Sequence, residues 1–173
     1  MKVMCISDIH GSIENLKKAI ERFHEESAEK LLILGDFSSY YYSSSDFEVA
    51  EMLNNMAGAI IAVKGNCDNS HIDELFNFGL GYLKTIEFNG LKVTLTHGHI
   101  YNRNNLPENC GEIFLSGHTH VGMIEKIGDR IIANPGSISK PRGGTKKSYL
   151  ILDEESIKLK ALGGELIKSV KLH

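Results

Sequence analysis

The sequence predicts one α/β (α+β) domain spanning residues 1–173, in which two packed sheets are flanked by helices. Strand–helix–strand patterns follow one another twice in the first 63 residues. From residue 84 onward, the pattern changes to short apolar strands joined by tight turns. No Pro/Ser-rich linker divides the chain, and its 173 residues suit one domain with a substantial core. These three observations favour one layered unit over two separate domains.

The first half predicts two consecutive βαβ units. Short apolar runs without alternation are typical of interior strands. They occupy residues 2–7, 30–34 and 59–63. A first helix is expected from Ser12, a fair N-cap, to about Glu26, because apolar residues recur there at helical spacing. Asp46 is expected to cap a second helix, and Asp68 or Asn69 a short third one. Each βαβ unit predicts a parallel strand pair with a right-handed crossover.

The second half predicts strands joined by tight turns. Asn89-Gly90 separates two strand-like runs, which is a strong hairpin signal. Gly128-Asp129 and Gly163-Gly164 mark two further turns. The strands are expected over residues 85–88, 91–96, 112–116, 121–127, 130–133, 148–153, 156–161 and 166–170.

The composition of the chain argues against two classes of binding partner, nucleic-acid polymers and membranes. A net charge of −3 without a Lys/Arg block argues against a nucleic-acid polymer. A small basic cluster is interpreted as a solvated loop; it consists of Lys140, Arg142, Lys146 and Lys147. No apolar run approaches the roughly 18 residues of a membrane span. Three scattered cysteines and an N-terminus unlike a signal peptide indicate a reduced, cytoplasmic setting.

Polar side chains with metal-binding chemistry follow five of the predicted strands. In open α/β sheets, ligands bind beyond the carboxyl ends of the strands. Seven groups are too many for one transition metal and fit two when a carboxylate bridges them. Nitrogen and oxygen donors without thiolate suit Mn, Fe, Zn, Ni or Co. Two such ions clamp an in-line displacement at a phosphate ester. The expected ligands are Asp8, His10, Asp36, Asn66, His97, His118 and His120.

The order of these motifs resembles that of the calcineurin-like metallophosphoesterase superfamily, and especially its small phosphodiesterases of the YfcE type. The motifs are Asp8-x-His10, Gly35-Asp36, Gly65-Asn66-x-Asp68, His97-Gly98-His99 and Gly117-His118-Thr119-His120, followed by Asn134-Pro135-Gly136-Ser137. The resemblance implies a four-layer α-β-β-α sandwich and two divalent ions, with manganese expected first.

The resemblance also implies a division of labour among the ligands. Three residues would hold the first ion, three the second, and Asp36 would bridge them. A metal-bridging hydroxide would be the nucleophile that attacks phosphorus, with Asn66 and His99 as the residues nearest the reaction. The first ion would take Asp8, His10 and His120, and the second Asn66, His97 and His118.

One position departs from the pattern. Many relatives have a histidine directly after the asparagine, where this chain has Cys67. A thiol with an ordinary pKa near 8.5 is a poor replacement for an acid. We therefore expect a preference for small phosphodiesters or activated leaving groups. His99 is interpreted as either a proton donor or phosphate contact, or as a group that orients a ligand. The remaining histidines, His24, His71 and His173, are expected at the surface.

Several alternatives stay open at this stage. Phosphomonoester or nucleotide hydrolysis at the same site is one, and a weakly catalytic interaction scaffold of the same fold is another. The loop of residues 37–45, with its three tyrosines, is either a surface loop or a wall beside the metals. The C-terminal strands could pair between subunits, so a homo-oligomer is a further alternative. Asn102, Arg103 and the Asn134–Ser137 turn are candidates for lining the substrate pocket.

Overall fold

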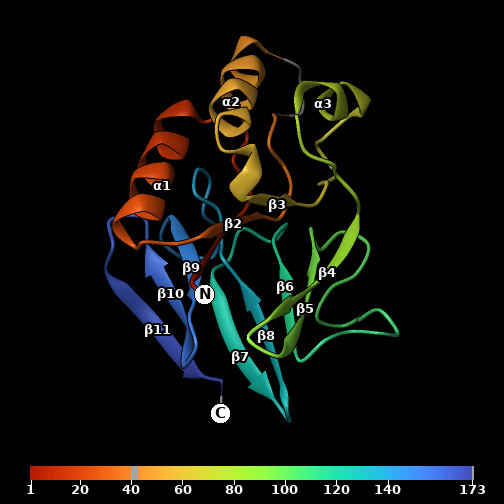
Figure 1. Cartoon of the computed structure of the whole chain (residues 1–173), viewed down its shortest axis with the longest axis vertical. Helices are drawn as coiled ribbons and strands as arrows, with labels where there is room; N and C mark the ends of the chain where they lie inside the picture. Colours follow the sequence, from red (N-terminus) through yellow and green to blue (C-terminus); the bar gives the residue numbers. More distant parts are fainter. Residues whose placement is uncertain (40–42, 173) are drawn as a thin grey trace.

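The computed structural model describes residues 1–39 and 43–172. Its strands form two sheets, one of six strands and one of five (Figure 1). Tyr40–Tyr42, and with them the interpretation of that loop as a wall, lie outside the described residues, as does His173.

The first sheet combines a parallel and an antiparallel half. β1 (Val3–Ile6), β2 (Lys30–Ile33) and β3 (Ile60–Ala62) are parallel neighbours, which confirms the two predicted βαβ units. The antiparallel half continues from β1 in the order β9, β10 and β11. These strands are β9 (Ser148–Leu152), β10 (Ser156–Ala161) and β11 (Leu166–Lys171).

The second sheet has the order β4-β5-β6-β8-β7. The predicted Asn89-Gly90 hairpin joins β4 to β5, and both turn residues have positive φ, 49° and 81°. That conformation matches a two-residue turn of the type that follows strand twist. The strands are β4 (Leu83–Phe88), β5 (Leu91–Thr96), β6 (Ile113–Ser116), β7 (Met123–Ile127) and β8 (Arg130–Asn134).

In the described part of the chain, three α-helices accompany the sheets, namely α1 (Ile13–Glu25), α2 (Ser44–Asn54) and α3 (Ser70–Leu75), with a short 3-10 turn, η1 (Ala57–Ala59), after α2. The prediction that Asp46 caps the second helix is wrong, because Ser43 occupies the N-cap. Asp46 is instead the third helical residue and accepts a hydrogen bond from the Ser43 amide at 2.8 Å, which completes a capping box. Asn69 caps α3 by accepting from the His71 amide at 3.0 Å.

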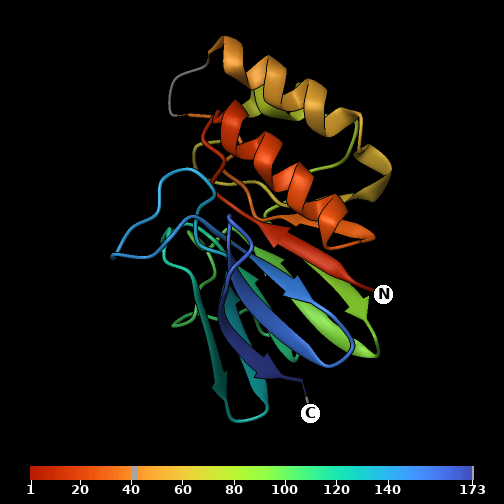
Figure 2. The same ribbon diagram turned by 90° about the vertical axis from the view of Figure 1, so that its left-hand side faces the viewer.

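Two apolar cores hold the layers together. One lies between the helices and the outer face of the six-stranded sheet, and includes Leu16, Val49 and Ile72. The other lies between the two sheets. The predicted fold class is therefore confirmed, and Figure 2 shows the helices on one side of the strands. That one domain spans residues 1–173 stays a prediction.

The far side of the sandwich differs from the four-layer expectation in one respect. Within the described part of the chain, no helix covers the outer face of the five-stranded sheet. The irregular segment 98–112 runs there instead, and its Gly111 amide donates to Thr94 Oγ1 at 2.9 Å. Short asparagine-rich sequence interrupted by Pro107 has no helical periodicity, which explains the difference. No helix among residues 1–39 and 43–172 is long and apolar enough to cross a membrane.

A polar network joins the end of α1 to the antiparallel half of the first sheet. Glu26 accepts a hydrogen bond from the Tyr149 hydroxyl at 2.8 Å and pairs with Lys160. Burial opposes ionisation of Glu26, yet the contacts with Lys160 and Tyr149 keep its pKa below the ordinary value. A carboxyl with a lowered pKa stabilises the fold above its unfolded pKa of about 4.3 and loses that contribution as pH falls further.

Glu26→Gln is therefore expected to lower the unfolding temperature at neutral pH and to flatten its fall on acidification below about pH 4.3. Thermal unfolding followed by circular dichroism across that range measures both effects. Glu25→Gln is the matched control, since Glu25 is an exposed neighbour that pairs only with Arg22 among the ion pairs of the described residues. Parallel acid profiles of wild type and Glu26→Gln would contradict the assignment.

Candidate metal centre

The predicted ligands meet where strands of both sheets end. Backbone hydrogen bonds join the loops that follow these strands. The Asp8 amide donates to the Gly35 carbonyl at 3.1 Å, linking the ends of β1 and β2. The Gly117 amide donates to the His97 carbonyl at 2.7 Å, linking the ends of β6 and β5. The carboxyl ends of β1, β2, β3, β5 and β6 therefore face one site, as expected for this class of sheet.

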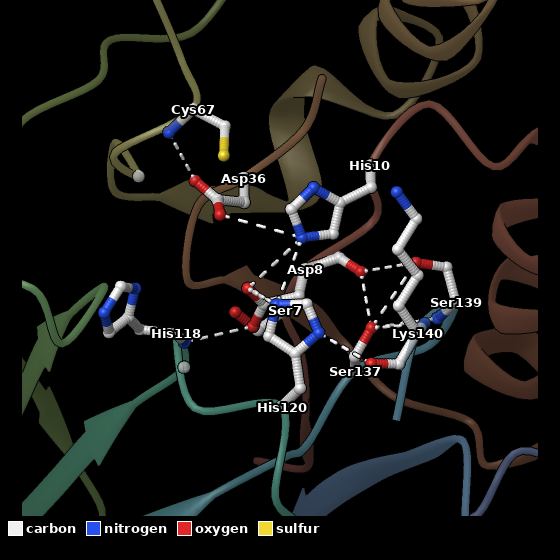
Figure 3. Close-up of polar contacts among 12 residues, drawn as sticks. Ser7, Asp8, His10, Asp36, Cys67, His118, His120, Ser137, Ser139 and Lys140 are labelled. Atoms are coloured by element: carbon white, nitrogen blue, oxygen red, sulfur yellow. Dashed lines mark hydrogen bonds and ion pairs between the residues drawn. The ribbon is translucent and has the colours of Figure 1, made fainter. Parts of the chain in front are cut away.

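Four of the predicted ligands form a tight cluster. Donor atoms of Asp8, His10, Asp36 and His120 all lie within 4.8 Å of one another. Asp8 Oδ1 is 3.2 Å from His120 Nε2, and His10 Nε2 is 3.7 Å from both Asp8 Oδ1 and Asp36 Oδ2. Figure 3 shows these side chains converging from three separate loops. Two carboxylates and two imidazoles at this spacing are a donor set that divalent metals bind.

The other predicted ligands lie on the far side of Asp36. His97 Nε2 is 3.4 Å from Asp36 Oδ2 and 3.0 Å from Asn66 Oδ1. The His118 ring lies 5.1 Å from the His97 ring, while the His118 amide donates to Asp8 Oδ2 at 3.1 Å. Asp36 therefore stands between two groups of donors. The structure brings all seven predicted residues together.

Backbone strain is concentrated at this site. Among residues 1–39 and 43–172, seven non-glycine residues have positive φ. Five of them are predicted ligands, with φ between 49° and 67°: Asp8, His10, Asp36, His118 and His120. This conformation costs a non-glycine residue on the order of 1–2 kcal/mol, and such strain is typical of functional sites. It lets Ile9 turn into the core while Asp8 and His10 face the same cluster.

Neighbouring carbonyls orient two of the imidazoles. His97 Nδ1 lies 2.6 Å from the Leu34 carbonyl, and His120 Nδ1 lies 2.6 Å from the Lys140 carbonyl. A carbonyl accepts only, so Nδ1 carries a proton and Nε2 is the nitrogen left to face the cluster. A metal would bind each ring through Nε2.

The carboxylates fit a cation as well. Asp8 Oδ1 is buried and accepts no hydrogen bond from the described residues. Burial opposes ionisation of Asp8, yet His10 and His120 keep its pKa well below the ordinary value. The pKa of Asp36 is likewise lowered despite burial, mainly by His97. Among the ion pairs of the described residues, Asp8 and Asp36 pair with histidines and not with Lys or Arg. A metal ion bound between these carboxylates and imidazoles would supply the positive charge that two buried carboxylates need.

Asp68 is a functional residue that the sequence analysis missed as such. Its buried carboxylate accepts hydrogen bonds from four backbone amides. Oδ2 accepts from Asp36 and Gly65, both at 2.8 Å, and Oδ1 accepts from Phe37 at 2.8 Å and Ser38 at 3.3 Å. The carboxylate thus ties the loop after β2 to the loop after β3. The Gly-Asn-x-Asp motif includes Asp68, but the sequence indicated it only as a possible helix cap and not as a residue that holds two loops together.

The Asn134–Ser137 turn also braces the site from behind. Ser137 Oγ donates to the Asp8 carbonyl at 2.8 Å, and Asn134 Nδ2 donates to the Gly117 carbonyl at 2.7 Å. Both side chains are buried, so the turn positions ligand loops instead of lining a pocket. Arg103 is an exposed residue that pairs with Glu125 of β7 at 2.7 Å.

His99 and Cys67 flank the predicted ligands. The His99 ring lies 5.4 Å from the His97 ring, and its buried Nδ1 has no hydrogen-bond partner among the described residues. Burial first, and then the charges of His97 and His118, lower the pKa of His99. Burial and the Asp36 carboxylate raise the pKa of Cys67 to about 12. The thiol therefore holds its proton and is a poor general acid, as the sequence predicted.

Gly117 leaves the space that Asp8 occupies. A Cβ at this position would lie 2.0 Å from Ser7 Oγ and 2.8 Å from Asp8 Oδ2. Gly117→Ala is therefore expected to displace Asp8 and to lower kcat/KM at least tenfold, since misplacing a reacting group by about 1 Å costs up to 10²-fold. Steady-state kinetics with added metal measures this. Gly58→Ala is the control, because its Cβ would meet no atom within 4 Å; equal effects would refute the argument.

The fold and the site together define a metal-dependent phosphoric ester hydrolase. The chain belongs to the calcineurin-like phosphoesterase superfamily, whose domain model matches residues 1–156. Membership of this family, together with the Asp/His cluster, indicates that the chain binds divalent metal cofactors.

Among known proteins, the chain is similar to phosphodiesterase YfcE of Escherichia coli strain K12. The two are 35% identical over 175 residues, which covers 96% of this chain and 95% of the relative. The solved structure of the E. coli phosphoesterase Yfce matches with a TM-score of 0.91 and covers 100% of both chains.

More distant relatives extend the comparison. Phosphodiesterase MJ0936 of Methanocaldococcus jannaschii is 29% identical over 153 residues, covering 79% of this chain and 83% of the relative. Vps29 from Entamoeba histolytica, solved as a complex with Zn²⁺, has a TM-score of 0.72 over 100% of both chains. At 21% identity, this last likeness shows the fold alone.

Proposed function

We propose that the chain is a phosphodiesterase that hydrolyses a small phosphodiester with two divalent ions, manganese first among them. One observation carries the proposal: Asp36 stands between two sets of metal donors. Its Oδ2 lies 3.7 Å from His10 Nε2 on one side and 3.4 Å from His97 Nε2 on the other. A carboxylate in this position is suited to bridge two ions.

The donors divide accordingly. The first ion would be held by Asp8, His10 and His120, whose donor atoms cluster with Asp36. The second would be held by His97 together with Asn66 and His118, which both lie beside the His97 ring. When bound, two divalent ions supply electrophilic activation of the phosphoryl group and an activated water.

The chain's own residues attract the substrate and hold the metal ligands in place. Two ionised carboxylates against two divalent ions leave a formal charge of +2, which attracts an anionic phosphodiester. The Leu34 and Lys140 carbonyls hold the imidazoles in one orientation, so the site needs little rearrangement. Asn66 is exposed, so its amide would be open to an incoming substrate. His99 supplies a ring N–H to a phosphoryl oxygen or to the leaving group.

The preference for diesters rests on Cys67. Its thiol, with a pKa raised to about 12, supplies no proton readily to a leaving group. The names of YfcE and MJ0936 as phosphodiesterases support the same substrate class. A net charge of −3 supports a small substrate over a nucleic-acid polymer. Three free cysteines support a reduced, cytoplasmic location.

Hydrolysis of bis-p-nitrophenyl phosphate, compared with the p-nitrophenyl monoester, tests the proposal. We expect chelation to abolish turnover, added Mn²⁺ to restore it, and kcat/KM for the diester to exceed that for the monoester. Metal analysis of the protein should give two ions per chain. Faster turnover of the monoester would overturn the diester preference. Absence of metal-dependent turnover with either ester would favour an interaction scaffold of the same fold.

A further inference from the structure

Tyr82 lies at the edge of the metal centre. It directly precedes β4, and Leu83 pairs with Thr96 in the β4-β5 ladder. Tyr82 therefore stands one residue beyond that pair, beside the point where β5 ends and His97 follows. The Thr96 hydroxyl donates to the Tyr82 carbonyl at 3.1 Å. The ladder and this hydrogen bond fix the backbone of Tyr82 relative to the proposed ligands.

A row of rings runs from the proposed ligands to Tyr82. The His99 ring lies 5.4 Å from the His97 ring and 6.2 Å from the His118 ring. His99 also meets Tyr82 edge-on, with 5.9 Å between the ring centroids. His99 is thus the link between the metal centre and an aromatic side chain at the surface.

The exposure of Tyr82 leaves its ring open to a ligand beside the site. Its side chain is 50% exposed, whereas Phe88, the aromatic residue at the opposite end of β4, is only 1% exposed. The anionic phosphoryl group of a substrate would be drawn to the divalent ions held by the carboxylate and imidazole cluster, so its organic substituent has to extend along the neighbouring surface. The ring row offers that substituent an aromatic surface, and aromatic rings prefer stacked or edge-on partners.

We propose that Tyr82 binds a planar aromatic or heteroaromatic substituent of the phosphodiester by stacking. The inference rests on the proposed function, because it places the phosphoryl group at the metal centre. It narrows the substrate class to diesters that carry a ring, either a simple aryl group or a nucleobase.

Isothermal titration calorimetry on the Mn²⁺-loaded protein tests this without requiring turnover. In each of two ligand pairs, one member carries an aromatic ring system in place of a small group: phenylphosphonate against methylphosphonate, and adenosine 5′-monophosphate against ribose 5-phosphate. We expect the ring-bearing member to bind about fivefold to tenfold more tightly to wild type, as aromatic contacts of this kind contribute. Preference in the first pair alone identifies an aryl substituent, and preference in both identifies a nucleobase.

Variants at Tyr82 decide the cause of the preference. Tyr82→Ala and Tyr82→Leu should abolish it, while Tyr82→Phe should keep it, because the ring and not the hydroxyl or the apolar area stacks. Ile127→Ala is the matched control, since Ile127 is 52% exposed at the end of β7, which is remote from the site. Its preference should equal that of wild type.

Three results would overturn the inference: no ring preference in wild type, an unchanged preference in Tyr82→Ala, or full preference in Tyr82→Leu. Diester turnover measured on the same samples separates this inference from the proposed function. Turnover without a Tyr82-dependent preference defeats the stacking role alone. A Tyr82-dependent preference without any turnover defeats the phosphodiesterase assignment and leaves the aromatic subsite supported.

Discussion

Asp36→Asn is expected to lower kcat/KM for a phosphodiester by about 10³-fold, equivalent to about 4 kcal/mol of transition-state stabilisation. The reason lies in the two oxygens of Asp36. Oδ1 accepts a hydrogen bond from the Cys67 amide at 2.8 Å, and an asparagine carbonyl keeps that bond. Oδ2 faces His10 and His97, and an amide nitrogen in that position carries hydrogens and has no free lone pair to give to a metal.

The substitution therefore separates loop geometry from metal binding. We expect metal analysis to show fewer than two ions per chain in Asp36→Asn. The unfolding temperature of the metal-free protein should change little, because the contact with Cys67 survives. Asp129→Asn, in the exposed turn between β7 and β8, is the control and should retain wild-type activity and metal content. Two tightly bound ions and more than a tenth of the activity in Asp36→Asn would refute a bridging role.

The sequence predicted what depends on local pattern. Helical periodicity placed α1, and the Asn89-Gly90 turn placed the β4-β5 hairpin. The ligands could be predicted because side chains with metal-binding chemistry follow five strands, whereas any one of them alone would be read as a turn, cap or structural residue. Their convergence follows from the parallel order of β1, β2 and β3 in one sheet and of β5 and β6 in the other, since the carboxyl ends of parallel neighbours meet at one edge.

Other features depend on contacts between distant segments and have no local signal. The positive φ of Asp8 and His118 comes from the way neighbouring loops fit together, and residue type alone does not indicate it. The N-cap at Ser43 was not predicted because Asp46, three residues later, is itself a good cap residue and was preferred. Within residues 1–39 and 43–172, no helix covers the outer face of the five-stranded sheet because the segment 98–112 is irregular, whereas the expectation of a helix there came from the resemblance.

The role of Asp68 could not be predicted from the sequence, because its carboxylate binds amides of two loops that are distant along the chain. Replacing Asp68 is expected to have a large effect on both stability and metal affinity. In Asp68→Asn, two of the four amides that now meet carboxylate oxygens would face an NH₂ group instead. Each unsatisfied buried donor costs about 1–3 kcal/mol. We expect the free energy of unfolding to fall by about 2–4 kcal/mol, and metal affinity by about 10–100-fold, as for other groups that orient ligands. Denaturant unfolding and metal titration measure the two effects.

The matched control is Asp153→Asn in the turn between β9 and β10. Asp153 Oδ1 also accepts from backbone amides, those of Glu155 at 3.0 Å and Ser156 at 2.9 Å, but far from the metal centre. This variant should lose stability while keeping wild-type metal affinity. Because Asp68 acts through the loop that carries Asp36, saturating Mn²⁺ should restore most of the activity of Asp68→Asn and little of that of Asp36→Asn. Equal metal affinity in Asp68→Asn and wild type would show that Asp68 supports the fold alone.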